Sequence, residues 1–414
     1  MLKIYSCFLF ILITIQFLYA QSRTAGCIRL ETNSKLSIFD GKPCISDQHH
    51  ELNGIFEQLY KLTQTKEDTS KLVIMHIGDS HMQGGMLSGG IRNHFHQHFG
   101  NAGRGLIVPY RLSKSNEPRD YSIKSNVKWQ KSRCIEKSSA LPIGVGGISV
   151  ATDESKADLH ISVLGDEIQD YSFNKIRVFG KNNTLAPGTD GNIWAYADED
   201  SSVFVLNEPT NSIDLYPRQT SDYTSPTLFG GVSLENSHKG VLYHAIGANG
   251  AHYQDYVKHS EFFSQAALLK PNLIIVSLGT NEAFGGRFNK IAFVAQLEAM
   301  VAALHYHNLN AVVMLTTPAE VFIKKKARRK TKSTPNYNCD LVADAIVEFA
   351  LAHHLPVWDM NKITGGEGSA KIWLTHKLLR PDRIHFTEAG YTLQADLFFK
   401  SFITNYNLYV ESRH

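Results

Sequence analysis

The sequence is poor in cysteine and has no excess of one charge. Its 414 residues include 5 cysteines and no Cys-x-x-Cys pair, so a zinc site or a thiol redox site has no support. The 42 Lys and Arg residues nearly balance the 39 Asp and Glu residues, which argues against a general nucleic-acid binder. The hydrophobic content of 43% is typical of a folded globular protein.

Positive charge is concentrated in one short segment, Lys324 to Lys332. This run carries seven basic side chains, so the rest of the chain is slightly acidic. Such a run could guide an acidic polymer toward an active site, but charge runs more often form solvated loops. We therefore predict a solvated loop and keep the docking role as the alternative.

One long apolar stretch is present, and it lies at the start of the chain. Residues Ile4 to Leu18 follow Lys3 and precede Tyr19-Ala20 and a polar segment. This pattern predicts a secretory signal peptide over residues 1–20. A membrane anchor, or a lipid attached at Cys27, is the alternative, although the stretch is short for a spanning helix. We expect an exported protein, periplasmic or secreted, with no membrane span after cleavage.

Export would place the remaining cysteines in an oxidising compartment. Cys27 and Cys44 are close in sequence and could be bridged, whereas Cys134 and Cys339 could be bridged or simply buried. The sequence leaves the pairing open.

Five apolar segments rich in β-branched residues indicate buried strands. They cover residues 71–77, 241–246, 273–278, 311–316 and 356–360, and helical periodicity follows at about 83–99, 252–264, 289–305, 338–353 and 387–403. The alternation predicts a doubly wound, flavodoxin-like α/β fold with a parallel five-stranded sheet. Ligands bind such folds at the carboxyl ends of the strands.

A different pattern interrupts this alternation over residues 142–236. Short β-type runs are separated there by turn signals such as Pro187-Gly188, without a long helical period. We predict an inserted all-β sandwich. After the signal peptide, residues 21–141 would hold an N-terminal segment and the first part of the α/β domain, and residues 237–414 would hold the remainder.

Two motifs supply the parts of a nucleophilic site. Gly78-Asp79-Ser80-His81 follows the first strand, where a serine can be a nucleophile or merely a helix cap. Asp382 and His385, two residues apart on one loop, can provide a general base and the carboxylate that orients it. The alternative for this pair is a helix-entry Asp beside a surface His.

Two further strand ends carry groups that can stabilise an oxyanion. The Asn281 amide follows the third strand, and a glycine-rich turn with Gly247 and Gly250 follows the second. Both can donate hydrogen bonds to a developing negative charge. All four motifs fall where this fold places its active sites.

At these residues the sequence resembles the SGNH, or GDSL, hydrolase superfamily. The resemblance implies Ser80 as nucleophile, His385 as base and Asp382 as its orienter. It also implies three oxyanion donors: the N–H groups of Ser80 and Gly250, preferred over Gly247 from the family's spacing, and the amide of Asn281. No metal ion and no organic cofactor is implied.

Two departures and the insertion resemble one branch of this superfamily. His81 follows the serine where many members have an apolar residue, and Glu282 replaces the commoner Asp. This branch contains bacterial peptidoglycan O-acetylesterases, whose insertion is similar to a carbohydrate-binding module. The resemblance implies an exported serine esterase acting on an acetylated glycan, peptidoglycan first. Alternatives are an esterase for another polysaccharide of the xylan type, a glycan O-acetyltransferase, or a non-catalytic glycan-binding protein.

Two sets of aromatic residues have simpler explanations. His94, His96 and His98 resemble a metal cluster, but their spacing on a helix predicts a solvated face. Three tryptophans could stack on sugar rings, but most tryptophans are buried in the core. They are Trp129, Trp194 and Trp373, and Trp194, in the insertion, is the preferred candidate for sugar contact.

Overall fold

The computed structural model of the chain describes residues 27–28, 45–64, 69–165, 169–180, 185–188, 194–198, 200–218, 226–327 and 330–413. The predicted signal peptide and Cys44 lie outside these residues. Within these ranges, no helix combines the length and the apolar character needed to cross a bilayer.

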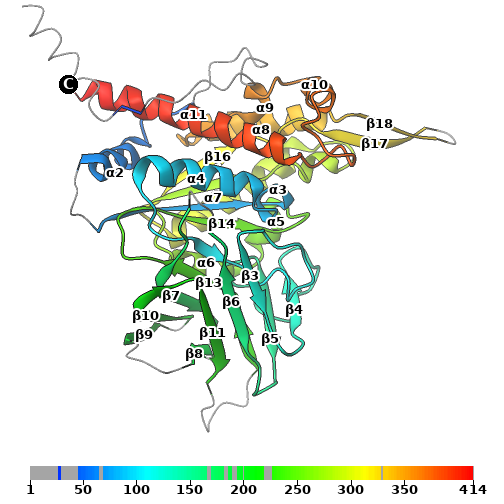
Figure 1. The fold of residues 1–414 in the computed structure, drawn as a ribbon. Helices are drawn as coiled ribbons and strands as arrows, with labels where there is room; N and C mark the ends of the chain where they lie inside the picture. Colours follow the sequence, from blue (N-terminus) through cyan, green and yellow to red (C-terminus); the bar gives the residue numbers. More distant parts are fainter. Residues whose placement is uncertain are drawn as a thin grey trace, which may run out of the picture.

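A five-stranded parallel sheet forms the centre of the α/β domain (Figure 1). Its strands, in spatial order, are β14 (Gly240–Gly247), β1 (Lys71–Gly78), β15 (Leu273–Ser277), β16 (Val312–Thr316) and β19 (Val357–Trp358). All four neighbouring pairs are parallel. Counted along the chain, the order is 2-1-3-4-5, which is the flavodoxin-like arrangement. The predicted α/β fold is therefore confirmed.

Two groups of helices cover this sheet, whose strands are apolar because they are buried on both faces. The first group consists of three helices that pack against one another: α2 (Asn53–Gln64), α4 (Met86–Phe99) and α11 (Glu388–Ser412). The other comprises α5 (Tyr253–Val257), α6 (Ser260–Ala267), α7 (Lys290–His307) and α8 (Asn338–Ala352). Shorter helical turns are α3 (Ser80–Gln83), η3 (Glu282–Phe284), α9 (Met360–Ile363) and α10 (Ser369–Thr375).

Antiparallel strands follow α4 and continue as far as β14, and they form the lower part of the molecule in Figure 1. The first sheet joins β2 (Gly105–Ile107), β13 (Gly231–Glu235), β7 (Phe173–Phe179), β10 (Ser201–Thr210) and β9 (Trp194–Asp198). The second joins β3 (Tyr121–Lys124), β6 (Leu159–Val163), β11 (Ser212–Pro217) and β8 (Leu185–Pro187). The third joins β12 (Thr227–Phe229), β5 (Ile148–Thr152) and β4 (Gln130–Arg133). We call residues 105–235 the β region.

The β region begins earlier than residue 142, where the sequence placed the start of the insertion. Strands β2, β3 and β4 all precede that position. Each has only three or four residues, which is too short for alternating hydrophobicity to reveal a strand.

The prediction of a loop at Lys324–Lys332 is wrong, although Lys324 and Lys332 are exposed as expected. This segment lies in an antiparallel hairpin of β17 (Phe322–Ala327) and β18 (Lys330–Pro335), which projects from the α/β domain in Figure 1. A run of like charges has no alternation of hydrophobic and polar residues, so the strand pairing left no trace in the sequence pattern.

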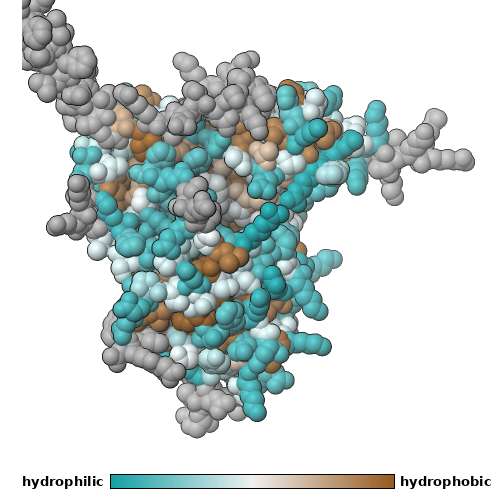
Figure 2. Space-filling model, in the orientation of Figure 1, coloured by the Kyte–Doolittle hydropathy of each residue, from teal (hydrophilic) through white to brown (hydrophobic). Residues whose placement is uncertain are grey.

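The face shown in Figure 2 is largely hydrophilic, with hydrophobic residues in small patches.

Several side chains singled out by the sequence are structural. Cys134 and Cys339 are buried free thiols. Trp129 and Trp373 are buried, and their indole N–H groups donate to Ser125 Oγ and to the Thr364 carbonyl. Trp194 lies in β9, but its side chain is not among those described.

The predicted solvated face for the histidines of α4 is wrong for His96. This side chain is only 5% exposed, and its Nδ1 lies 2.9 Å from Gln169 Oε1. The error arises because α4 is covered by the β region as well as by α11, a contact that helical periodicity cannot reveal. In the described part of the chain, no group of three or more His, Cys, Asp or Glu side chains could hold a metal ion.

Candidate active site

The turn after β1 presents Ser80 at the carboxyl end of the sheet. A Cβ atom on Gly78 would lie 2.3 Å from Met82 Cγ and 2.9 Å from the Ser277 carbonyl oxygen, so only glycine fits at this turn. Asp79 caps α3 by accepting a hydrogen bond from the His81 N–H at 2.9 Å. The capping role therefore belongs to Asp79, and Ser80 is the first residue of α3.

A chain of three polar side chains begins at this serine. Ser80 Oγ lies 2.9 Å from His385 Nε2, and His385 Nδ1 lies 3.0 Å from Asp382 Oδ2. The first pair is 305 residues apart in the sequence. Both distances are within hydrogen-bonding range, so the hydroxyl can donate to the imidazole while the imidazole donates to the carboxylate. The structure thus brings together the three residues expected to form a nucleophilic triad.

Hydrogen bonds within the loop between α10 and α11 hold the acid and the base in this geometry. Asp382 Oδ1 accepts hydrogen bonds from the N–H groups of Ile384 and His385, each at 2.9 Å. The Arg380 N–H donates to the His385 carbonyl at 2.8 Å, which closes the loop. Burial alone would raise the pKa of Asp382, but these N–H groups and the His385 ring outweigh it and hold the pKa below its ordinary value. Asp382 is therefore ionised at neutral pH.

The two candidate glycines after β14 differ in what their N–H groups contact. The Gly247 N–H donates to the Tyr110 hydroxyl at 3.1 Å, in a buried position. Gly250 lines the same cleft as Ser80, and among the described residues its N–H has no acceptor. Its φ of +82° suits glycine. Gly250 is therefore available to a ligand, whereas Gly247 is already engaged.

Asn281 lies on the other side of Ser80 and also lines the cleft. Its Nδ2 donates to Asp79 Oδ2 at 3.2 Å and to the Ala251 carbonyl at 3.0 Å. Burial is the main influence on Asp79, which is 1% exposed, and it raises the pKa to about 6. Nothing in the motif Gly78-Asp79-Ser80-His81 indicates that Asp79 contacts Asn281, because the two residues meet only in the folded chain.

The two residues that depart from the family pattern, His81 and Glu282, both lie beside the site. His81 Nδ1 lies 2.9 Å from the Tyr391 hydroxyl, and burial lowers the pKa of His81 to about 3, so its ring is neutral. Glu282 accepts a hydrogen bond from the Tyr253 N–H at 2.8 Å, and burial raises its pKa to about 7. Tyr391 was missed from the sequence, since nothing in a helical aromatic residue indicates that it contacts the turn after β1.

A cleft of about 790 Å³ extends from Ser80 along the start of α4. One wall combines Gly84, Gly85 and Gly89 with the larger side chains of Met86, Arg92 and Asn93. Residues 116–120, Leu164 and Tyr171 of the β region form the facing wall. The cleft is much larger than an acetyl group requires, and it lies between the α/β domain and the β region.

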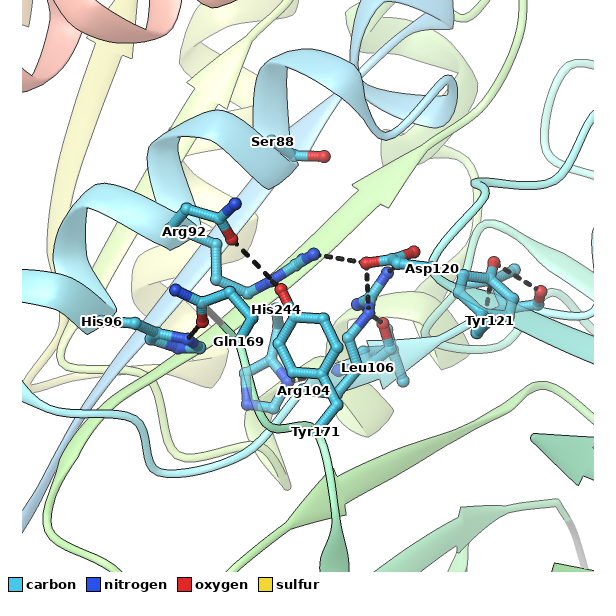
Figure 3. A network of polar contacts seen from close by, with 12 residues as sticks. Ser88, Arg92, His96, Arg104, Leu106, Asp120, Tyr121, Gln169, Tyr171 and His244 are labelled. Atoms are coloured by element: carbon cyan, nitrogen blue, oxygen red, sulfur yellow. Dashed lines mark hydrogen bonds and ion pairs between the residues drawn. The ribbon is translucent and has the colours of Figure 1, made fainter. Parts of the chain in front are cut away.

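A buried ion-pair network supports the far end of this cleft (Figure 3). Asp120 lies between two guanidinium groups, that of Arg92 on α4 and that of Arg104, whose Nη2 is 2.9 Å from Asp120 Oδ1. Arg92 Nε also donates to the Tyr171 hydroxyl at 3.1 Å. Burial alone would raise the pKa of Asp120, but the two arginines outweigh it and hold the pKa below its ordinary value. This network fixes the β region against α4.

Comparison with known proteins agrees with this geometry. Residues 220–393 match the model of the GDSL-like Lipase/Acylhydrolase family. The chain carries a GDSL-like hydrolase domain. The matched segment of this domain contains Gly250, Asn281, Asp382 and His385, whereas Ser80 precedes it and joins the site only through the fold.

The GDSL-like domain and the β region together have a counterpart among solved structures. A structure described as a peptidoglycan O-acetylesterase is 20% identical, with a TM-score of 0.72 over 87% of this chain and 99% of the other. This likeness shows the shared fold. A lipase/acylhydrolase from Enterococcus faecalis is 21% identical, with a TM-score of 0.30 over 40% of this chain and 77% of the other. No curated protein matches the sequence.

Proposed function

We propose that the protein is an exported serine esterase that removes O-acetyl groups from a carbohydrate, with peptidoglycan as its substrate. The observation that carries the proposal is the contact chain from Ser80 Oγ through His385 to Asp382. The domain match supports ester hydrolysis, and the described activity of the structural neighbour supports an acetylated glycan. The predicted signal peptide supports action outside the cytoplasm.

Acylation begins when His385 Nε2 takes the proton from Ser80 Oγ. The Oγ atom attacks the acetyl carbonyl carbon, and the carbonyl π electrons move to its oxygen. When this tetrahedral intermediate collapses, the bond from the carbonyl carbon to the sugar oxygen breaks, and His385 returns the proton to that oxygen. The deacetylated glycan leaves, and an acetyl ester remains on Ser80.

Deacylation repeats these steps with water as the nucleophile. His385 removes a proton from water and the hydroxyl oxygen attacks the acetyl carbon. His385 then returns the proton to Oγ as acetic acid leaves, and the acid ionises to acetate in solution. Ionised Asp382 accepts the Nδ1–H of the ring in both stages, and so stabilises the imidazolium that forms. A glycan hydroxyl in place of water would make the reaction a transfer.

Three groups can donate a hydrogen bond to the oxyanion, with the Asn281 amide exchanging one of its two contacts, with Asp79 Oδ2 or with the Ala251 carbonyl, for the oxyanion. The N–H groups of Ser80 and Gly250 and the side-chain amide of Asn281 all belong to residues that line the cleft next to the nucleophile. Each donor of this kind contributes roughly 10²- to 10³-fold in rate. Ester hydrolysis needs no further catalytic group, because His385 gives its proton to the sugar oxygen as that oxygen leaves.

The test is acetate release from O-acetylated peptidoglycan and from acetylated xylan. Ser80→Ala should abolish release, and Ser260→Ala, an exposed helical serine outside the cleft, should leave it unchanged. Serine-dependent release from peptidoglycan is the expected result. Release from xylan alone would overturn the proposed substrate. Release from neither would overturn the esterase assignment and favour a transferase or a glycan-binding protein.

A further inference from the structure

One positive charge in the catalytic cleft has no acidic partner among the residues that the structure describes. Arg380 is exposed and lines the cleft together with Ser80 and His385. It makes no ion pair with the described part of the chain, and its guanidinium Nη2 has only a weak contact, 3.9 Å from Met86 Sδ. An exposed arginine contributes little to the stability of the fold, but at the mouth of an active site its charge acts on the substrate.

The carboxylates that line the cleft on the side of the β region already have basic partners. Glu117 accepts from Arg111 Nε at 3.1 Å, and Asp120 lies between Arg92 and Arg104. A second arginine on the facing wall, Arg119, is 3.7 Å from Glu388, with both side chains largely exposed. The carboxylates in the cleft are therefore neutralised locally, and Arg380 adds a positive charge beside the nucleophile that has no ion-pair partner among the described residues.

The position of Arg380 relative to the base is fixed by the backbone. Its N–H donates to the His385 carbonyl at 2.8 Å, and its own carbonyl accepts from the Arg383 N–H at 2.9 Å. Arg383, on the same loop, is occupied elsewhere: its guanidinium lies 5.4 Å from the centre of the Phe322 ring. Of the two arginines on the catalytic loop, only Arg380 lines the cleft.

We propose that Arg380 binds a carboxylate of the substrate, so that the enzyme selects acetylated glycans that carry carboxylate groups over neutral ones. This inference rests on the proposed esterase function and narrows its substrate class. A planar guanidinium matches a carboxylate through two parallel hydrogen bonds, and its single charge balances that of one carboxylate. The carboxylate can lie on a sugar ring, as in a uronic acid, or on a peptide attached to the glycan.

The experiment compares three acetylated substrates. An O-acetylated oligogalacturonide carries its carboxylates on the rings, an O-acetylated muropeptide carries them on the peptide, and an O-acetylated xylo-oligosaccharide is neutral. Arg380→Gln should raise KM about tenfold for at least one carboxylated substrate, with kcat nearly unchanged. The neutral substrate should be unaffected, and the carboxylated substrate that responds identifies where the carboxylate lies.

Two further variants separate charge recognition from loop damage. Arg380→Lys keeps the charge but loses the planar fork, and should give an intermediate KM. Arg383→Gln removes a charge from the same loop outside the cleft, and should preserve the selectivity of the wild type. An unchanged KM for both carboxylated substrates in Arg380→Gln would overturn the inference. An equal loss on the neutral substrate would also overturn it, because the residue would then only support the loop.

A binding measurement keeps this inference distinct from the proposed function. Calorimetric titration with a non-acetylated oligogalacturonide and a non-acetylated muropeptide reports carboxylate binding without any turnover. Weaker binding of either ligand by Arg380→Gln supports the carboxylate site even if hydrolysis of a simple ester such as 4-nitrophenyl acetate fails. Hydrolysis of that ester, with equal binding by both proteins, supports the esterase and overturns the carboxylate site.

Discussion

The side-chain nitrogen of Asn281 is held 3.2 Å from the buried carboxylate of Asp79 and 3.0 Å from the Ala251 carbonyl. A carbonyl can only accept, and an ionised carboxylate can only accept as well, so the amide nitrogen and not its oxygen must face them. Asp79 also caps α3, whose first residue is Ser80. One carboxylate thus positions both the nucleophile and a proposed oxyanion donor.

Replacing Asp79 with Asn should therefore reduce catalysis through Asn281. A neutral amide at position 79 can donate as well as accept, which allows the Asn281 amide to turn its oxygen toward residue 79 and its nitrogen away from the place that it holds beside the nucleophile. We expect kcat to fall about 10- to 100-fold with little change in KM. The decisive measurement is a double-mutant cycle, because Asp79→Asn should cost far less in an Asn281→Ala background. Additive effects would contradict this positioning role.

The titration of Glu282 should make stability depend on pH near neutrality. Burial raises its pKa to about 7, so the folded state holds the proton more tightly than the unfolded state does. The unfolding free energy should then fall as the pH rises from about 4.5 through 7, and Glu282→Gln should lack this fall. Melting temperatures of both proteins between pH 5 and pH 8 test this, and parallel profiles would refute it.

The two glycines after β14 should respond differently to alanine. A Cβ atom on Gly247 would lie 2.3 Å from the Gln83 nitrogen and 2.8 Å from the Asp79 carbonyl oxygen, whereas a Cβ on Gly250 meets no atom within 4 Å. Gly250→Ala should cost only about 1 kcal/mol for its left-handed backbone. Gly247→Ala should destabilise the protein more, as measured by denaturant unfolding. An equal effect of the two substitutions would show that the turn rearranges.

Removing the charge of Asp120 should destabilise the junction between α4 and the β region. Arg92 and Arg104, with side chains 2% and 3% exposed, would be left as buried charges without a carboxylate. Loss of one partner of a buried ion pair typically costs about 3 to 5 kcal/mol. Asp120→Asn should show this in urea unfolding, with Asp214→Asn as control because the Asp214–His160 pair is exposed. A loss no larger than that of the control would contradict the structural role of the network.

The sequence predicted those parts of the fold whose burial is uniform. Strands such as β1 and β15 are covered on both faces, so each appears as a continuous apolar run that ends at a motif. The hairpin of β17 and β18 and the short strand β2 gave no such pattern, because pairing there does not depend on alternating hydrophobicity. Their strand partners are set by tertiary contacts.

The candidate site also contains residues that the sequence predicted and contacts that it did not. Ser80, Asp382 and His385 were found because their spacing at strand ends and on one loop is visible locally. The contact of Tyr391 with His81 joins residues 310 positions apart. The compensation of Asp120 by two arginines likewise depends on packing between α4 and the β region. Such relationships follow from the assembled fold and leave no signal at any single position.

The two ends of the β region meet beside the sheet, and this geometry bears on how the protein folds. The Val241 N–H donates to the Gly100 carbonyl at 2.9 Å, and β2 pairs with β13. Leu106 donates to His244 across 138 residues of chain. If the β region folds first, it brings its own ends together and shortens the effective loop that β1 and β14 must close. The loop-closure entropy of their parallel pairing then falls, so this long-range step becomes faster.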